Sequence, residues 1–495
     1  MTTTANHTPD PTKAIDRTRL LIHGEWVDAA DGAEFDVYNP STGQVFTRVS
    51  EAGPEDVNKA VESSRKAFEE GPWRNMTPLD RSAALWRLGD LLLEHADEIG
   101  RVETLDQGQP FSIARHGSVP SAARMFHYMS GWATKIEGNT IPISAGGDFH
   151  VYTRREPIGV VGCIVPWNFP LVIAAWKVAP ALAAGNTVIL KPAEQTPLTA
   201  LMLGELALEA GIPAGVLNVI PGYGGRTGQT MTEHMGIDKI SFTGSTTTGR
   251  RIVDASKGNL KRLSLELGGK SANIIFPDAD IEAAIGGSAN GIFFNAGQAC
   301  AAGSRLYVHE NVYDEVVAGI AEVAKNIKVG DGFDPTSEIG PLASVQHLDR
   351  VAGYLKSGIS EGARTVTGGT QIDTQGYYVA PTVFADARED QKIVQEEIFG
   401  PVVVALKFTD TEEVMKAANK SAYGLAGGIW TKNISTAHKV AAQFQAGSVW
   451  VNCYQVFEPA MPFGGYKESG WGREMGHEVF NDYTQVKTVC VNLDA

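Results

Sequence analysis

Short apolar runs alternate with amphipathic stretches through the middle of the chain, and this alternation predicts a doubly wound α/β sheet. Helical patterns at 197–210 and 246–255 lie between short runs that are rich in apolar residues. Such runs are typical of parallel strands that are buried on both faces and joined by crossover helices. The predicted strands cover residues 159–165, 187–190, 216–220, 239–242 and 263–267.

The pattern continues on both sides of this region. Upstream, 54–70 and 78–98 are predicted helices, each with proline in its first turn, where the missing N–H is not needed. Downstream of Lys270, a predicted strand at 305–309 and a helix at 312–327 begin a second alternation, which predicts a second α/β domain.

Two segments fit neither domain. Residues 150–156 and 484–492 alternate apolar and polar positions, as strands with one face in water do. From the pattern alone they are edge strands or strands that meet another subunit.

Composition limits the possible functions. With 495 residues, of which 43% are hydrophobic and 20% charged, the chain can bury more than one core. Its net charge of −15 argues against nucleic acid and against an acidic membrane as partners, because phosphate binding needs a basic surface.

Cysteine and histidine usage narrows the chemistry further. The four cysteines, at 163, 300, 453 and 490, form no Cys-x-x-Cys pair, which indicates a reduced, cytoplasmic setting. The 11 histidines show no metal-ligand spacing, so no metal is expected. The longest apolar stretch, at 171–184, is interrupted by Lys177, and residues 1–19 are expected to be a disordered lead-in rather than a signal peptide.

Two residues suggest covalent catalysis. Glu266 lies in the apolar run 262–269, and Cys300 ends the segment Phe-Phe-Asn-Ala-Gly-Gln-Ala-Cys at 293–300. A thiolate attacks carbonyl carbon, and a carboxylate can then drive water onto the acyl-sulfur bond. Taken alone, Cys300 is more often an inert buried residue. A carboxylate inside an apolar strand must be paired, neutralised or catalytic.

These two segments and five further motifs resemble the aldehyde dehydrogenase superfamily, in the family's order and spacing from about residue 20 to the C-terminus. The further motifs are Pro166-Trp167-Asn168-Phe169-Pro170, Lys191-Pro192-Ala193-Glu194, Phe242-Thr243-Gly244-Ser245, Glu397-Ile398-Phe399-Gly400-Pro401 and Pro462-Phe463-Gly464-Gly465-Tyr466-Lys467.

The resemblance implies two doubly wound Rossmann-like domains plus a small bridging β element. It assigns 20–139 and 159–268 to the NAD-binding domain and 269–479 to the catalytic domain. It assigns 140–158 and 480–495 to bridging strands, and it implies a homo-oligomer, either a dimer or a homotetramer.

The resemblance also implies a mechanism. Cys300 attacks the aldehyde, and the Asn168 amide with the backbone N–H of Cys300 forms the oxyanion hole. Glu266 drives hydrolysis of the thioester, and Lys177 and Glu474 relay the proton. Without the family, Asn168 is equally suited to cap the helix that follows it.

The expected cofactor is NAD, although the usual dinucleotide fingerprint is absent. The segment 222–228 has Thr227 where the third glycine belongs, whereas Gly244 to Gly249 follows a strand and opens a helix, which favours an anion. Glu194 after a strand end can accept bonds from ribose hydroxyls and repel a 2′-phosphate. The cofactor-binding residues implied are Ile164, Pro166, Trp167, Lys191, Glu194, Gly224, Gly244, Ser245, Gly249, Leu267, Gly268, Glu397 and Phe399.

The substrate pocket implied by the resemblance is apolar and contains no arginine. It favours an apolar or aryl aldehyde such as phenylacetaldehyde, while aromatic faces leave betaine aldehyde as an alternative. Glu266 argues against a CoA-acylating enzyme, and the motifs together argue against a non-enzymatic protein. The pocket residues are Phe169, Ile173, Trp176, Ala299, Ala301, Phe457 and Phe463.

Overall fold

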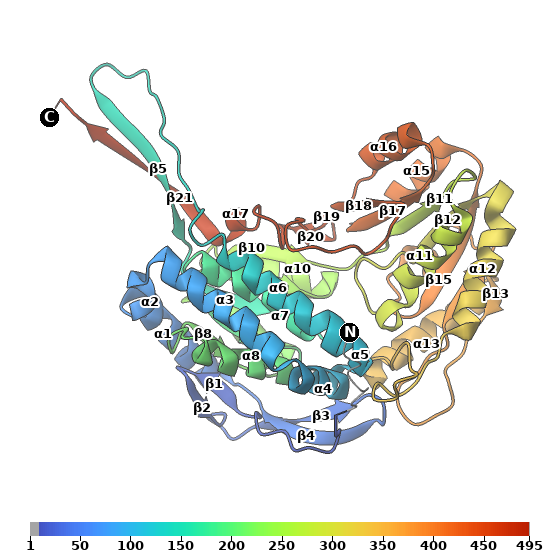
Figure 1. Ribbon diagram of the computed structural model, residues 1–495, viewed down its shortest axis with the longest axis horizontal. Coiled ribbons are helices and arrows are strands. Elements are labelled where there is room, and N and C mark those ends of the chain that lie inside the picture. The colour runs from blue at the N-terminus through green and yellow to red at the C-terminus, as the bar shows by residue number, and fades with distance from the viewer. Residues whose placement is uncertain (1–8, 495) are drawn as a thin grey trace, which may run out of the picture.

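The computed structural model describes residues 9–494 and contains two large, mostly parallel sheets that lie side by side (Figure 1). The first has the order β2-β1-β8-β7-β6-β9-β10-β20. All five strands predicted for it are present, and strands 6 to 10 run parallel. Its strands are β1 Leu20–Ile22, β2 Glu25–Val27, β6 Val160–Ile164, β7 Thr187–Lys191, β8 Leu217–Val219, β9 Lys239–Thr243, β10 Arg262–Glu266 and β20 Gly470–Trp471.

Helices cover both faces of this sheet, and one predicted helix is divided in two. The segment 78–98 forms α3 Pro78–Glu94 and the start of α4 Ala96–Gln107, because His95 closes the first helix and opens the second. No glycine or proline marks that break in the sequence. The other helices of this unit include α1 Pro54–Glu69, α6 Val119–Ser130, α7 Pro170–Ala183, α8 Leu198–Glu209, α9 Gln229–Glu233 and α10 Thr246–Ser256.

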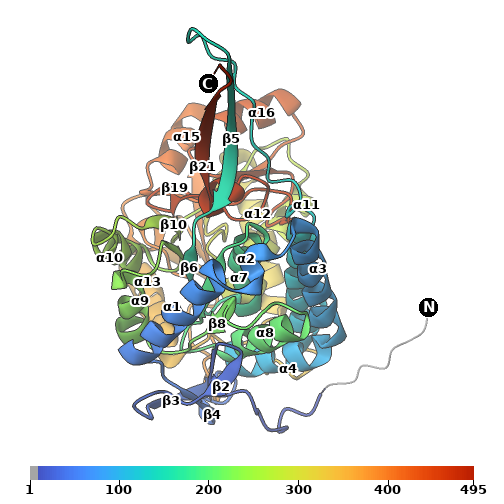
Figure 2. The ribbon, with the colours of Figure 1, turned by 90° about the vertical axis from the view of Figure 1, so that its left-hand side faces the viewer.

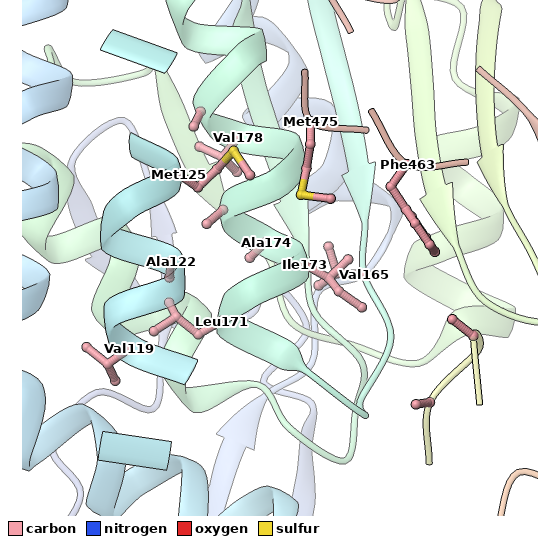
Figure 3. Packing of buried hydrophobic residues seen from close by; sticks show 14 of the residues in the cluster. Val119, Ala122, Met125, Val165, Leu171, Ile173, Ala174, Val178, Phe463 and Met475 are labelled. Atoms are coloured by element: carbon pink, nitrogen blue, oxygen red, sulfur yellow. The ribbon is translucent and has the colours of Figure 1, made fainter. Parts of the chain in front are cut away.

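The centre of the first unit is the contact between α6 and α7. Nearly every residue of α7 is buried, so this helix is apolar all round rather than amphipathic. Alanines at the contact let the two helix backbones approach closely. The facing residues are Val119, Ala122 and Met125 of α6 and Leu171, Ala174 and Val178 of α7 (Figure 3).

The second sheet confirms the second α/β unit. Its order is β13-β14-β15-β12-β11-β17-β18, and only β13 runs antiparallel to its neighbour. Its strands are β11 Ala272–Ile275, β12 Arg305–His309, β13 Arg364–Thr367, β14 Thr382–Ala385, β15 Val402–Phe408, β17 Ala426–Trp430 and β18 Ser448–Val451. Its main helices are α11 Ile281–Phe293, α12 Tyr313–Asn326, α13 Val345–Ser360, α15 Thr411–Asn419 and α16 Ile434–Gln443.

The chain crosses back into the first unit near its end. Strand β20 lies within the range 269–479, yet it pairs antiparallel with β10, so that Gly470 lies opposite Glu266. Gly470 has φ +110, and a side chain at this position would meet the Leu265 carbonyl at 1.9 Å. This return of the chain covers the strand that ends in Glu266.

The two alternating segments pair with each other. Strand β5 Phe149–Pro157 runs antiparallel to β21 Thr484–Asn492, from Thr484 opposite Pro157 to Asn492 opposite Phe149. The resulting two-stranded ribbon projects away from both units (Figures 1 and 2). A second small ribbon, β3 Glu34–Asn39 with β4 Gln44–Ser50, lies at the opposite end of the molecule (Figure 2).

The expected lead-in falls partly outside the described residues, which begin at Pro9. From there to residue 19 the chain is attached to the first unit. The Arg17 guanidinium lies 3.0 Å from Glu98 and also pairs with Glu205, and Arg101 donates a 3.1 Å hydrogen bond to the Lys13 carbonyl. Across residues 9–494, none of the helices combines the length and apolar character needed to cross a membrane.

Candidate active site

A cleft between the two units contains the candidate nucleophile. The first unit contributes Trp167 and the start of α10, and the second contributes Cys300, Glu397 and Phe399. Ligands of open α/β sheets bind where the strands end, which is where this cleft lies.

Cys300 follows a turn with unusual backbone geometry. Helix α11 ends at Phe293, and Asn295, Ala296 and Gly297 then have φ values of +51, +54 and +72. Three consecutive left-handed residues reverse the chain within one turn. Close behind, a side chain at Gly269 would come within 2.3 Å of the Cys300 carbonyl, so only glycine permits this approach. Burial, with the Glu397 and Glu266 carboxylates, raises the pKa of the Cys300 thiol to about 12.

Glu266 is the last residue of β10, and its side chain is enclosed. Its carboxyl oxygens have no hydrogen-bond partner among residues 9–494. A side chain at Gly464 would come within 2.8 Å of Glu266 Oε1, which shows how closely the 463–465 segment covers it. Burial and the nearby Glu474 raise the pKa of Glu266 well above its usual range. In this enclosure the protonated form of the carboxyl group is favoured more than it is in an exposed glutamate.

Lys177 and Glu474 form a buried ion pair near this carboxyl group. Lys177 Nζ lies 2.6 Å from Glu474 Oε1 and also donates a 3.1 Å hydrogen bond to Ser241 Oγ. Burial raises the pKa of Glu474, and the Lys177 ammonium opposes that rise. Both groups act electrostatically on Glu266, so the structure brings together the three residues predicted for the base and its relay.

Asn168 does not cap α7. The N-cap is Phe169, which makes no side-chain capping bond. Instead, the buried Asn168 side-chain amide donates a 2.9 Å hydrogen bond to the Gln298 carbonyl, two residues before Cys300. An amide nitrogen has two hydrogens, so one N–H is left for a second acceptor beside the thiol.

The start of α10 has the features of an anion site. Gly244 and Ser245 follow β9, and the Ser245 hydroxyl accepts a hydrogen bond from the Thr248 N–H. The free N–H groups of the first turn and the positive end of the helix favour a phosphate. Thr243 adds a buried hydroxyl without a partner in the described chain, and Gly249 lets the helix approach Leu267, which a side chain would meet at 2.7 Å. These groups fit the pyrophosphate of a dinucleotide.

Eight of the predicted cofactor residues line the cleft, and five lie outside its lining. Those in the lining are Pro166, Trp167, Gly244, Ser245, Leu267, Gly268, Glu397 and Phe399. Those outside are Ile164, Lys191, Glu194, Gly224 and Gly249.

Three of these five residues, Lys191, Glu194 and Gly224, lie at or after the ends of β7 and β8. Lys191 is the last residue of β7, and its Nζ lies 3.9 Å from Glu194 Oε2. The lysine is buried, which lowers its pKa to about 8, so this is not a solvated surface pair. Gly224 begins a helical turn and faces open space.

The second unit contributes residues that the sequence did not reveal. The ring of His347 of α13 donates a 2.7 Å hydrogen bond to the Phe399 carbonyl, and it lies 4.9 Å from the ring of Trp167. Phe399 itself has φ +66. Burial lowers the pKa of His347 to about 4, so the imidazole is neutral and its N–H donates this bond. The other cleft residues missed from the sequence are Gln195, Thr243, Thr246 and Thr247 of the first unit and Ser344, Gln346, Arg350 and Tyr423 of the second.

Glu397 is fixed on both sides. Its Oε1 accepts a 2.8 Å hydrogen bond from the Gly269 N–H, and its carbonyl accepts one of 2.7 Å from Arg350 Nη2. Burial raises the pKa of Glu397. The carboxyl group is therefore held in the cleft beside Gly268, ready to accept from a ligand hydroxyl.

None of the predicted substrate residues is part of the cleft lining, and three of them form an aromatic cluster. Trp176, Phe457 and Phe463 make a cluster with ring centroids 5.5 to 5.9 Å apart. Phe169 stacks on Phe294 at 5.9 Å. Phe457 is 40% exposed, and the buried members are Ile173, Ala299, Ala301 and Phe463.

Comparisons with known proteins identify what this architecture is similar to. The sequence model of the aldehyde dehydrogenase family matches residues 26–489. The mitochondrial benzaldehyde dehydrogenase of Antirrhinum majus is 47% identical over 484 residues, covering 98% of this chain and 90% of its own. The mitochondrial aldehyde dehydrogenase of Rattus norvegicus is 47% identical over 493 residues, covering 99% and 95%.

Solved structures of aldehyde dehydrogenases have the same fold as this chain. The NAD+ complex of the aldehyde dehydrogenase from Bacillus cereus superimposes with a TM-score of 0.95 at 49% identity, with 96% of each chain covered. An indole-3-acetaldehyde dehydrogenase complexed with NAD+ gives a TM-score of 0.95 at 42% identity, with 97% of each chain covered.

Proposed function

The chain belongs to the aldehyde dehydrogenase family, and from this premise we propose how its residues oxidise an aldehyde to a carboxylic acid. The overall activity is NAD-dependent aldehyde oxidation.

NAD is the cofactor, and bound NAD supplies the acceptor for the hydride that leaves the substrate carbon. In our proposal the start of α10 holds its pyrophosphate, Glu194 its adenosine ribose and Glu397 its nicotinamide ribose. Phe399 contacts the nicotinamide ring. The free N–H groups after Ser245 and the fixed carboxyl group of Glu397 support this assignment.

Cys300 is the proposed nucleophile. A thiol with a pKa of about 12 is almost entirely protonated at neutral pH, so its proton must pass to solvent in the cleft as the sulfur attacks. The sulfur forms a bond to the aldehyde carbon, and the carbonyl oxygen becomes an alkoxide. The free Asn168 N–H and the backbone N–H of Cys300 stabilise that charge. Loss of hydride from the same carbon leaves a thioester on Cys300.

Glu266 then drives hydrolysis. The carboxylate removes a proton from water, the water oxygen attacks the thioester carbon, and the carbon-sulfur bond breaks to release the carboxylic acid. The proton passes toward the Glu474 and Lys177 pair, which lies close enough to influence the Glu266 charge.

The observation that carries this proposal is the close approach of the chain segments that carry Cys300 and Glu266. Gly269 follows Glu266 by three residues, and a side chain there would meet the Cys300 carbonyl at 2.3 Å. Burial, and then the Glu397 and Glu266 charges, raise the pKa of the Cys300 thiol. Mixing the protein with NAD and benzaldehyde should produce NADH absorbance, and Cys300→Ala should abolish it. NADH production by Cys300→Ala at the wild-type rate would refute the assignment of the nucleophile.

The proposed substrate is an apolar or aryl aldehyde. The cluster of Trp176, Phe457 and Phe463 offers aromatic surface, of which Phe457 is partly open to solvent. The similarity to a benzaldehyde dehydrogenase and to an indole-3-acetaldehyde dehydrogenase supports an aryl substrate. At ~25 cal/mol per Å2, burial of a phenyl group contributes a few kcal/mol before binding costs.

A panel of aldehydes tests this choice. Phenylacetaldehyde, benzaldehyde and hexanal should exceed acetaldehyde in kcat/KM, mainly through KM. Phe457→Ala should reduce the preference, whereas the exposed Trp86→Ala on the outer face of α3 should leave it unchanged. If betaine aldehyde or succinic semialdehyde exceeds the aryl substrates by ~100-fold, or ~2.7 kcal/mol, the apolar-aldehyde proposal is wrong.

The projecting ribbon of β5 and β21 is the proposed contact with a second copy. Val486 and Val491 are 59% and 39% exposed on β21, and Leu493 after it is 56% exposed. Such apolar side chains on β21, which is an edge strand of a two-stranded ribbon in the described residues, favour addition of another strand. Light scattering should show a homodimer or homotetramer, and Val486→Lys should shift the mass toward the monomer. A monomeric wild-type protein would refute the contact.

The four free cysteines support a cytoplasmic location.

A further inference from the structure

The loop that carries Asn168 and the loop that carries Cys300 are tied together by two amide side chains. Asn168 Nδ2 donates 2.9 Å to the Gln298 carbonyl, and Asn295 Nδ2 donates 2.9 Å to the Asn168 carbonyl. The two bonds run in opposite directions between the same loops. All three residues are at most 4% exposed, so water does not compete for these bonds.

Asn295 is itself anchored by other elements. Its Oδ1 accepts a 3.2 Å hydrogen bond from Gln107 Nε2 at the end of α4. Its carbonyl accepts a 3.0 Å bond from Gln298 Nε2, and Gln298 Oε1 accepts a 2.9 Å bond from the Ala343 N–H. The amides therefore form a continuous buried chain from α4 in the first unit to the segment before α13 in the second.

Resting on the proposed role of Asn168 in the oxyanion hole, we propose that Asn295 is a positioning residue that sets where the Asn168 N–H lies relative to Cys300. Asn295 does not touch the substrate. It fixes the main chain of Asn168, while Gln298 fixes the side chain. An oxyanion donor is effective only within about 2.7 to 3.1 Å of the developing charge, and a misplacement of ~1 Å can reduce the rate by ~100-fold.

The backbone offers a matched pair of variants. Asn295 and Ala296 are neighbours with nearly equal left-handed φ values of +51 and +54, and only Asn295 carries an amide in the network. Asn295→Gly and Ala296→Gly therefore place a glycine in equivalent backbone conformations, which glycine adopts without strain. The difference between the two variants isolates the Asn295 amide.

The test is a double-mutant cycle on the rate of the NADH burst in a single turnover. Asn295→Gly should slow the burst by about 10- to 100-fold, while Ala296→Gly should stay within about 3-fold of wild type. In an Asn168→Ala background, Asn295→Gly should slow the burst no further, because the donor that it positions is gone. Alkylation of Cys300 by iodoacetamide, which forms no oxyanion, should match wild type in all variants.

Three results would overturn the inference. A burst of Asn295→Gly within 3-fold of wild type would show that the amide positions nothing. An equal slowing in the presence and absence of Asn168 would show that Asn295 acts on something else. Normal burst kinetics in Asn168→Ala would show that Asn168 does not stabilise the oxyanion, and the inference about Asn295, which depends on that role, would then be wrong as well. If Asn295→Gly melts far below wild type, Asn295→Ser provides the same comparison with a shortened donor.

Discussion

Lys177 Nζ lies 2.6 Å from Glu474 Oε1, with both side chains at most 2% exposed, near the Glu266 carboxyl group, which has no hydrogen-bond partner among the residues that the structure describes. Three ionisable groups are thus withdrawn from water within one region of the first unit. Desolvation makes such groups costly, so each depends on its neighbours for its charge state.

Breaking this ion pair should destabilise the fold. Lys177→Met leaves Glu474 buried without its partner and should cost about 3 to 5 kcal/mol of unfolding free energy, whereas the double variant Lys177→Met, Glu474→Leu should recover part of it. Urea unfolding measures both. The exposed pair of Arg48 and Asp36 at 2.8 Å is the control, and Arg48→Met should change little. A double variant as unstable as the sum of its two single variants would contradict the coupling.

The rate of thioester hydrolysis should rise with pH. Because the pKa of Glu266 is raised by burial, the fraction of carboxylate, which is the base, grows as pH increases toward that pKa and then levels off. Single-turnover release of the acid, measured across pH, should show this rise in wild type. It should be absent in Glu266→Gln, and an identical pH profile in that variant would exclude Glu266 as the base.

His347 should make stability depend on pH. Its pKa is lowered from 6.5 to about 4 in the folded protein, so between these values the unfolded chain binds the extra proton. Stability should therefore fall as pH falls from about 6.5 to 4, by up to about 3 kcal/mol. His347→Gln should flatten this slope in urea titrations, and His438→Gln on the exposed side of α16 should not. A slope unaffected by either change would rule out His347 as its source.

Glu194 should favour NAD over NADP by at least ~10-fold, about 1.4 kcal/mol, by repelling the 2′-phosphate. Glu194→Gln should narrow the ratio of the two kcat/KM values. Glu209→Gln removes the same charge from the exposed end of α8 and should leave the ratio unchanged. Equal use of both cofactors by the wild type would show that Glu194 does not face the ribose.

Most of the secondary structure could be predicted because local signals mark it. Prolines open α1 and α3, and short runs rich in apolar residues mark β6 to β10. The break at His95 could not be predicted, because neither glycine nor proline interrupts the helical pattern there. The return of β20 to pair with β10 depends on a contact between residues about two hundred positions apart.

The same distinction applies to the cleft. Cys300, Glu266 and Asn168 lie in motifs that the sequence displays together. His347 and Arg350 lie on α13, whose polar face resembles that of any solvated helix, so only the packing of the second unit against the first reveals them. Asn295 takes its position in the network from a left-handed backbone conformation, with φ +51, which the sequence around it does not predict.

The most direct test of the account is the mass of the acyl-enzyme. Glu266→Gln keeps the shape of the side chain and removes the base, so after mixing with NAD and benzaldehyde the thioester should accumulate. Peptide mass spectrometry should find one benzoyl group on the peptide that contains Cys300, with about one NADH formed per site. The absence of the adduct, or its presence at Cys163, Cys453 or Cys490 instead, would contradict covalent catalysis through Cys300.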